Sequence, residues 1–317
     1  MLLVFPFLFP PKHYYVFIIN LTGIAVIGGI GLNLLTGFTG QLSLGQHAFL
    51  AIGAYGAAIL GSKLHLPFWM TIPLVGCITA FAGLIIGLPA LRLKGLYLAM
   101  ATLAFAFIVD HFVAHSAITG ASAGIAVPRI RLGATVLRSD RAFYFLIISV
   151  VILLTILAKN LTRSRVGRAF VAIRDYDLAA NIIGVNLTKY KLYSFMISSF
   201  YVGVAGALYA YYMGFIAPDH FTLGVTIEYI AIIIVGGLGS ILGSIYGAIV
   251  ITLLPEILRM GTDLLREPYP LLSEYFGDLK TVAYGLVIVI FLVFEPEGFS
   301  GRWVKIKSYW RLWPFHN

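Results

Sequence analysis

Seven polar side chains lie among glycines in an otherwise apolar stretch near the start of the chain, and together they could form a passage for a polar solute. They are Asn33, Thr36, Thr39, Gln41, Ser43, Gln46 and His47. Polar groups at membrane depth need hydrogen-bonding partners or a water-lined cavity, and glycine-broken helices expose backbone groups that line transport pathways. The stretch therefore predicts a translocation pathway or gate. The alternative is a polar connector that caps two helices at the membrane surface.

A second glycine-rich stretch, residues 236–244, resembles the first and also precedes a helix of small residues. Two glycine-interrupted apolar segments in corresponding halves of a chain indicate a transporter with an internal repeat. We therefore predict a pathway that draws residues from both stretches. The candidates are Asn33, Thr39, Gln41, Ser43, Gly45, Gln46, Gly236, Gly237 and Gly239.

Asp110, His111 and His115 form a third group that could do chemistry. An acid beside histidines inside a membrane could relay protons, and the alternative is that all three are solvated where a helix leaves the membrane. Metal-ligating residues do not recur elsewhere at a usable spacing, so no metal site is predicted. No nucleophile is paired with a base in the sequence, so the chain is not predicted to be an enzyme.

The string Leu42-Ser43-Leu44-Gly45-Gln46 looks like the signature loop of ABC ATPases. That loop works only beside a phosphate-binding loop of the form G-x-x-x-x-G-K-[ST], which this sequence lacks. We therefore expect no ATP hydrolysis and no cofactor on this chain.

The composition identifies the elements that must position these residues. Of 317 residues, 60% are hydrophobic and 11% are charged, against about 25% charged in soluble domains, and the mean hydropathy is +0.95. These values exclude a disordered chain, a nucleic-acid-binding domain and a typical soluble enzyme. Nine apolar segments are long enough to be considered as spanning helices. They lie at about 14–35, 43–60, 67–89, 95–115, 142–158, 190–216, 222–240, 241–258 and 281–294.

Helix is the only state that satisfies the backbone of such segments in lipid. The sequence therefore predicts an all-α, polytopic bundle of about 8–10 spans, folded as a single transmembrane domain over residues 1–317. Segment 159–191 has seven basic residues against two acidic ones, so it is placed in the cytoplasm together with the basic and aromatic tail, 300–317. Alternation then places the arginine-containing loop 129–141 outside. Nine crossings would put the N-terminus outside, and one re-entrant segment would put it inside.

Residues 162–189 form an unusually long polar loop with apolar residues at near-helical spacing. The pattern predicts one or two short amphipathic helices at the membrane face, with Gly167 and Gly184 as candidate breaks. A lipid-binding helix is one interpretation. The mixture of Arg174, Asp175 and Asp177 is less basic than a lipid patch requires and favours a docking surface for another protein.

Four stretches carry a resemblance to the LivM-type permeases of bacterial branched-chain amino acid ABC importers. They are residues 167–191, 31–45, 95–105 and 236–243, and the resemblance covers about residues 20–296. Importer permeases carry a loop of the form E-A-A-x-x-x-G that docks into their ATPase. Ala179, Ala180 and Gly184 match that loop, and Leu178 replaces its glutamate.

The resemblance implies a complex in the bacterial inner membrane. This multi-pass chain and a second homologous permease subunit would form the pathway, two cytoplasmic ATPases would supply ATP and Mg²⁺ chemistry, and a periplasmic substrate-binding protein would deliver cargo. Transport would proceed by alternating access, with lipid around the bundle and no nucleic acid. The residues expected to couple the pathway to the ATPases are Arg168, Arg174, Asp175, Ala179, Ala180 and Gly184.

Two departures from the family pattern lie on the expected outer half. Phe107 stands where the family usually has a carboxylate, and the acid comes later, as Asp110. The family's glycine-rich loop is reduced to Gly120-Ala121-Ser122-Ala123-Gly124. The resemblance therefore leaves two cargo classes open, branched-chain or related small amino acids and urea or short amides. A stand-alone secondary transporter or channel is the alternative from another class.

Overall fold

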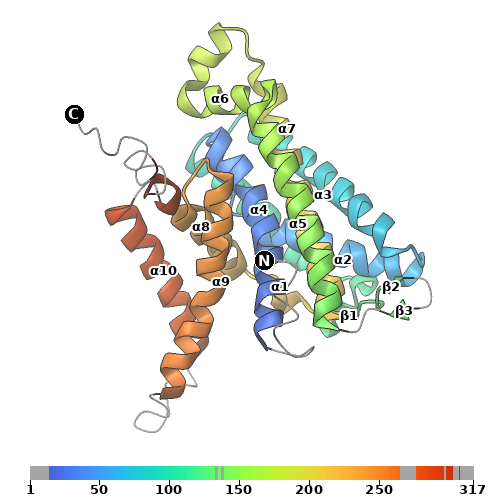
Figure 1. The fold of residues 1–317 in the computed structure, drawn as a ribbon. Helices are drawn as coiled ribbons and strands as arrows, with labels where there is room; N and C mark the ends of the chain where they lie inside the picture. Colours follow the sequence, from blue (N-terminus) through green and yellow to red (C-terminus); the bar gives the residue numbers. More distant parts are fainter. Residues whose placement is uncertain are drawn as a thin grey trace.

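The computed structural model confirms an all-α fold, which is drawn in Figure 1. It describes residues 14–132, 135–136, 139–264, 276–295, 298–302 and 307. The α-helices are α1 (Tyr14–Leu32), α2 (Gln46–Lys63), α3 (Phe68–Ala90), α4 (Leu96–His115), α5 (Asp140–Arg163), α6 (Arg165–Ile182), α7 (Leu187–Met213), α8 (Leu223–Gly236), α9 (Ile241–Leu264) and α10 (Phe276–Phe294). All nine apolar segments predicted from the sequence are helical.

Seven helices among the described residues are long and apolar enough to cross a membrane. Helices α2 and α10 correspond to the other two predicted segments but are not among these seven. Helix α10 has a shorter apolar stretch, Val282–Phe291, and α2 buries most of its residues inside the bundle. The tail residues 303–306 and 308–317 and the first thirteen residues lie outside the described part of the chain.

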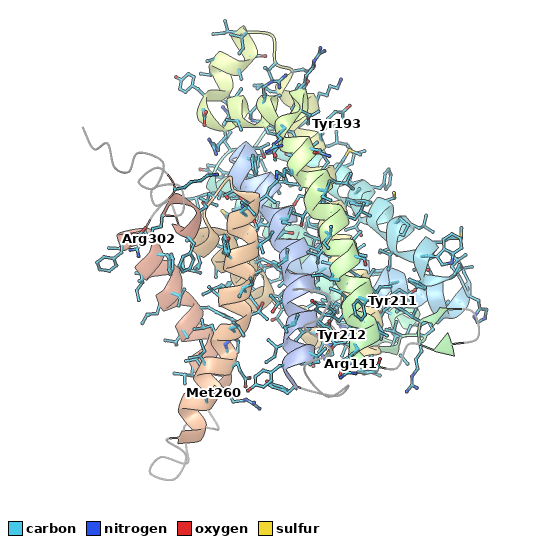
Figure 2. The ribbon with its side chains drawn as sticks, in the orientation of Figure 1. Arg141, Tyr193, Tyr211, Tyr212, Met260 and Arg302 are labelled. Atoms are coloured by element: carbon cyan, nitrogen blue, oxygen red, sulfur yellow. The ribbon has the colours of Figure 1, made fainter. Side chains whose placement is uncertain are left out.

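The bundle has two distinct ends. We call one the coupling end, because α6 caps it, at the top of Figure 1. The opposite end contains Asp140, whose main-chain oxygen accepts a hydrogen bond from Asn20 and whose carboxylate accepts one from Tyr212. Figure 2 shows Tyr212 and Arg141 at this opposite end and Tyr193 near α6.

Helix α1 runs from the opposite end to the coupling end. Tyr14 therefore lies at the end opposite α6, where its hydroxyl donates a 2.6 Å hydrogen bond to Glu256. The number of crossings stays a prediction, and seven of the described helices have the length and hydropathy of a membrane span. Charge places α6 in the cytoplasm, and on that basis Tyr14 and the loop ahead of Asp140 face outward.

Helix α1 does not end as an ordinary helix. It continues into a π-helical turn, η2 (Asn33–Gly37), and residues 40–45 are then non-helical until α2 begins at Gln46. Single π-turns of this kind are frequent at functional sites. The glycine-rich stretch predicted as a pathway or connector is therefore a break between two helices.

The outer layer near α4 and α8 consists of short pieces. They are η3 (Ala117–Thr119), η4 (Ala121–Ala123), β1 (Ile125–Ala126), β2 (Arg131–Leu132), β3 (Thr135–Val136), β4 (Phe215–Ile216) and η5 (Pro218–His220). Strand β1 pairs antiparallel with β4, with Ile125 opposite Ile216, and β2 pairs with β3. Strands β1 and β4 and the turn η5 join the end of α4 to the connection between α7 and α8.

Helix α7 lies at the centre of the bundle, against α1, α2 and α3. Small residues make this close packing possible, because they let helix backbones approach in lipid. Ala54 and Ala57 of α2 and Ala205 and Ala207 of α7 are fully buried. The core therefore holds α2 tightly, although α2 begins at a break in the chain.

Candidate functional site

The predicted amphipathic loop forms α6, which is two short helices joined by a kink. Tyr176 has φ −161° and ψ 100°, which interrupts the helix in its second half. Gly167, expected to be a break, instead lies inside the helix, where a side chain would collide with the main chain of Thr162. Gly184 does end the segment, with φ +91°.

The two halves of α6 have different surroundings. The first half buries Ala169, Phe170 and Ile173 against the bundle. The second half carries exposed apolar side chains, including Ile182 and Ile183, and stands clear of the other helices in Figure 1. The kink therefore separates a half that anchors α6 from a half that offers an apolar surface.

Arg174 joins α6 to the break after α1. Its Nη1 donates a 3.1 Å hydrogen bond to the main-chain oxygen of Gly37, and its Nε donates a 3.0 Å bond to Asp175. A side chain at Gly239, in the connection between α8 and α9, would lie 2.8 Å from Nη1. Arg174 thus lies where both glycine-rich stretches meet.

The remaining coupling candidates lie on or beside α6. Arg168 is exposed, and its Nη1 donates to the main-chain oxygen of Arg163. Ala179 and Gly184 are exposed, whereas Ala180 is buried. Of the two alanines that match the family loop, only Ala179 is therefore available to a partner.

Asn33 fastens the first glycine-rich stretch to the second. Its Nδ2 donates to the main-chain oxygen of Ser240 at 2.9 Å and to Ser244 Oγ at 2.7 Å, with a longer 3.4 Å contact to the Gly237 oxygen. Its Oδ1 accepts from the Gly239 N–H at 2.8 Å. Asn33 is 1% exposed, so this clamp is a buried part of the fold at the coupling end.

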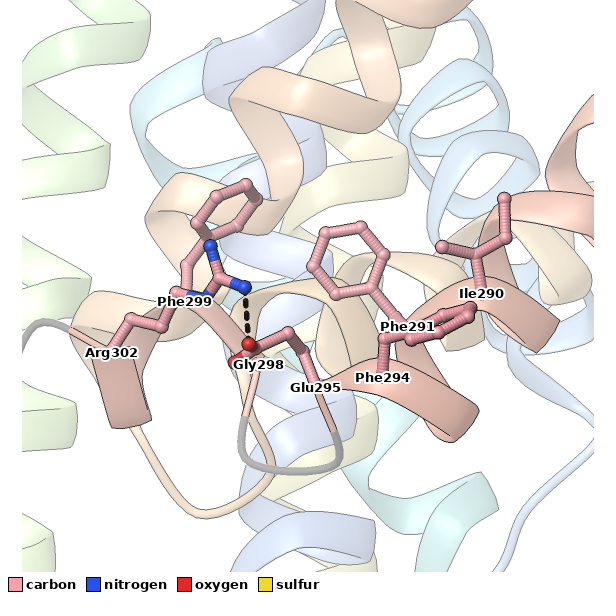
Figure 3. A pocket seen from close by; sticks show the side chains of 7 residues that line it. All are labelled: Ile290, Phe291, Phe294, Glu295, Gly298, Phe299 and Arg302. Atoms are coloured by element: carbon pink, nitrogen blue, oxygen red, sulfur yellow. Dashed lines mark ion pairs between the residues drawn. The ribbon is translucent and has the colours of Figure 1, made fainter.

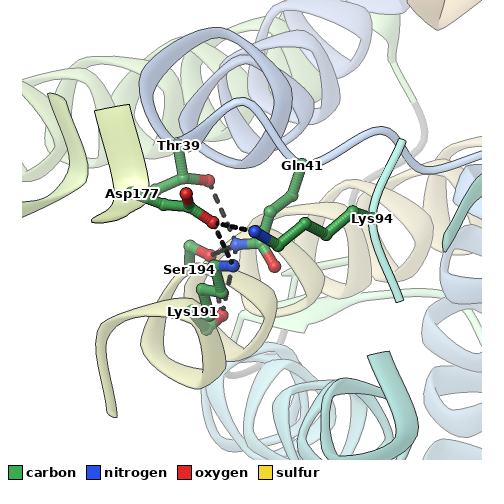
Figure 4. Close-up of polar contacts among 6 residues, drawn as sticks. All are labelled: Thr39, Gln41, Lys94, Asp177, Lys191 and Ser194. Carbon is green, nitrogen blue, oxygen red and sulfur yellow. Dashed lines mark hydrogen bonds and ion pairs between the residues drawn. The ribbon is translucent and has the colours of Figure 1, made fainter. Parts of the chain in front are cut away.

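Ionic contacts join α6 to the start of α4 and to α7, as Figure 4 shows. Asp177 accepts a 2.6 Å bond from Lys94 and lies 3.7 Å from Lys191. Gln41 Nε2 donates to Ser194 Oγ at 2.6 Å and lies 3.3 Å from Thr39 Oγ1. All of these residues except Ser194 line an open hollow of about 260 Å³ that is also lined by Arg174.

The Lys94 hydrogen bond, assisted by the positive charges of Lys94 and Lys191, holds the pKa of the Asp177 carboxyl below its ordinary value of 3.8. The carboxylate is therefore ionised at neutral pH, and the contact between α6 and the start of α4 is an ion pair.

The segment after α10 covers the second glycine-rich stretch. Glu295 and Arg302 form an ion pair in Figure 3, and a side chain at Gly298 would lie 2.6 Å from the Gly237 main-chain nitrogen. The connection between α8 and α9 is thus held from one side by Asn33 and approached from another by Gly298.

His47 makes a buried polar cluster in the middle of the bundle. Its Nδ1 lies 2.7 Å from Thr226 Oγ1 of α8, and its Nε2 lies 3.2 Å from Asp110 Oδ2 of α4. His47 is fully buried, and the Asp110 side chain is 35% exposed. Asp110 is therefore paired across helices, unlike His111 and His115, which are exposed. The expectation that all three residues are simply solvated is wrong for Asp110.

The other pathway candidates lie between these two regions. Ser43 is buried, and its Oγ accepts from the Gly45 N–H at 3.4 Å. The N–H of Leu44 donates to Thr102 Oγ1 of α4 at 2.9 Å. Gln46 is 0% exposed. Sequence reasoning missed the partners Thr102, Ser194 and Thr226, because the helix faces that bring these hydroxyls to residues 41–47 are set by tertiary packing.

No group of His, Cys, Asp or Glu among the described residues could hold a metal ion. The described chain therefore offers two polar regions, a hydrogen-bonded and ionic junction at the coupling end and the His47 cluster at mid-depth. The first can transmit a displacement of α6 to both glycine-rich connections. The second can offer polar groups to a solute inside the bundle.

Comparison with known proteins gives a consistent result. A family model described as "Branched-chain amino acid transport system / permease component" matches residues 14–292. The chain is 32% identical to the high-affinity branched-chain amino acid transport system permease protein LivM of Salmonella typhimurium, over 92% of this chain and 72% of that protein. It is 33% identical to LivM of Escherichia coli, over 89% and 68%.

A more distant relative is the autoinducer 2 import system permease protein LsrC of Yersinia pseudotuberculosis, with 29% identity over 45% of this chain and 39% of that protein. No solved structure matches.

Proposed function

Because the chain belongs to the family of permease components of branched-chain amino acid transport systems, we propose that it is the membrane-spanning subunit of an ATP-driven importer. It is a multi-pass protein of the bacterial inner membrane. Its cargo is a branched-chain or related small amino acid, which it moves by alternating access.

The Arg174–Gly37 contact carries this proposal. A transport subunit without an ATPase of its own must receive motion from outside, and the second half of α6 is the part that carries exposed apolar side chains at the coupling end. Arg174 connects that element directly to the break after α1 and lies beside Gly239 in the second break. A push on the exposed half of α6 therefore reaches both glycine-rich connections, the one between α1 and α2 and the one between α8 and α9.

The complex contains three further kinds of subunit. A second homologous permease completes the pathway, two cytoplasmic ATPases bind the exposed half of α6 and hold ATP and Mg²⁺, and a periplasmic binding protein delivers the amino acid. The free energy comes from ATP on the partners. This chain contributes contacts that differ between its inward-open and outward-open states, as any ligand-driven change requires.

The experiment is co-expression of this chain with the products of the neighbouring genes, capture in detergent, and uptake of labelled leucine and urea into proteoliposomes with and without ATP. Capture of an ATPase with ATP-dependent leucine uptake supports the proposal. ATP-dependent uptake of urea alone would support the importer but would show that its cargo is a short amide. Uptake driven by an ion gradient without an ATPase would replace the importer with a secondary transporter.

A further inference from the structure

The side-chain amide of Gln46 is the most unusual polar group inside the bundle. Gln46 is the first residue of α2 and is 0% exposed. Among the described residues, neither Nε2 nor Oε1 has a hydrogen-bonding partner. Buried polar side chains are nearly always hydrogen-bonded, so a glutamine that leaves both a donor and an acceptor unpaired requires an explanation.

The neighbours of Gln46, by contrast, are fully engaged. The N–H of His47 donates to Thr226 Oγ1 at 3.1 Å, and the His47 ring bridges Thr226 and Asp110. On the other side in sequence, the Leu44 N–H donates to Thr102. The main-chain N–H groups of Leu44 and His47 and the His47 ring therefore all have hydrogen-bonding partners, and the unpaired Gln46 amide is a local exception.

Asp110 adds a negative charge to the same region. It belongs to the spanning helix α4 and keeps 35% of its side chain exposed while it contacts His47. A partly exposed carboxylate at membrane depth is costly against lipid and normally faces water, protein or a solute pathway. This edge of α4, beside the start of α2, is thus suited to a pathway surface.

We propose that Gln46 is a cargo-contacting residue, whose carboxamide donates to the carboxylate and accepts from the ammonium group of an α-amino acid, with Asp110 nearby as the counter-charge. The inference rests on the proposed importer function and adds the residue that recognises the cargo by hydrogen bonds. A neutral amide cargo would satisfy Gln46 but would leave the charge of Asp110 unmatched, which is why we favour the zwitterion.

The apolar surroundings fit an aliphatic amino acid. Phe49 follows Gln46 by three positions, so the two side chains are neighbours on the surface of α2. Its ring lies 5.3 Å from that of Phe105 of α4, centroid to centroid. In the state described here Gln46 is enclosed, and the cargo reaches it when α4 separates from the start of α2.

The test is the variant Gln46→Met, which keeps an unbranched side chain and removes both hydrogen-bonding atoms. The wild-type complex is first required to capture its ATPase and take up leucine with ATP, so that failure of the proposed function is seen before the variant is measured. We expect the variant to retain ATPase capture and to melt at the same or a higher temperature. Its leucine uptake should fall by about tenfold or more, because hydrogen bonds to charged groups are strong.

Ser199→Ala is the matched control. Ser199 is 1% exposed in α7, and its Oγ also has no hydrogen-bonding partner among the described residues. Removing this hydroxyl should leave uptake unchanged. Gln46→Leu provides a second measurement if the methionine variant does not accumulate.

Two outcomes would overturn the proposal. Wild-type uptake by a well-folded Gln46 variant would show that the amide does not contact the cargo. If Gln46→Met and Gln46→Leu both lost uptake and thermal stability together, Gln46 would instead be a residue that stabilises the start of α2 by packing.

Discussion

The guanidinium group of Arg174 donates a hydrogen bond to the main-chain oxygen of Gly37 across 3.1 Å, although 137 positions separate the two residues. Arg174 belongs to the helix that caps the bundle, and Gly37 ends the π-helical turn after α1. The contact therefore joins the element predicted to meet a partner to the place where a spanning helix is broken. Its removal is the most direct test of how motion enters the bundle.

Arg174→Ala should uncouple transport. A hydrogen bond from a charged group contributes about 1.5–3 kcal/mol, and each 1.4 kcal/mol corresponds to a factor of ten, so leucine uptake should fall about tenfold or more. ATPase capture should persist, because the exposed half of α6 is unchanged. Arg165→Ala, an exposed arginine of the same helix, is the control for loss of charge. Equal uptake in both variants would contradict the transmission role of Arg174.

Gly184→Trp should weaken ATPase capture without removing the protein from the membrane. Gly184 has φ +91°, is exposed, and has no atom within 4 Å of an added Cβ, so the large ring would project into the docking surface. Gly214→Trp is the control, because Gly214 has φ +73° and equally open space at the opposite end of the bundle. Both variants bear similar backbone strain. If both captured the same amount of ATPase, the docking assignment would fail.

Asn33→Ala should destabilise the protein rather than slow each transport cycle. It removes a clamp that satisfies the Gly239 N–H and two main-chain oxygens, and each buried group left unpaired costs about 1–3 kcal/mol. We expect a lower melting temperature and less folded protein. Uptake normalised to folded protein should change little. A normal melting temperature with lost uptake would instead support the predicted role of Asn33 in the translocation pathway.

Asp177→Asn should remove a contribution to stability that depends on pH. The pKa of Asp177 is lowered in the folded chain by the Lys94 hydrogen bond, so this contribution is present above the ordinary value of 3.8 and is lost as pH falls through the folded-state pKa. The difference in melting temperature between wild type and variant should be constant from about pH 8 to pH 5 and shrink below about pH 4. A difference that instead disappears near neutral pH would exclude this ion pair as its source.

For Gln46, the melting temperature of a variant separates a role in folding from a role in transport. Natural chains keep destabilising polar groups mainly where function requires them. Gln46 is the clearest such position in the described bundle, since both of its amide atoms are buried and unpaired.

Several local features could be predicted because they depend on short stretches of sequence. The apolar segments gave the helices, and the basic residues of 159–191 predicted that α6 lies at one end of the bundle, outside the spanning segments. The helical spacing in 162–189 predicted an amphipathic element with a break at Gly184. The kink at Tyr176 was not predicted, since no glycine or proline marks it.

Hydropathy, charge and helical period are properties of neighbouring residues, and the sequence by itself therefore determined the all-α class, the apolar helical segments and the amphipathic element α6. The pairing of Asn33 with Gly239 and of His47 with Asp110 was decided only by the tertiary structure. Each pair joins segments far apart in the sequence, and in lipid many helix faces are equally apolar. Which polar groups meet is therefore set by the packing of small residues and the need of every buried polar group for a partner.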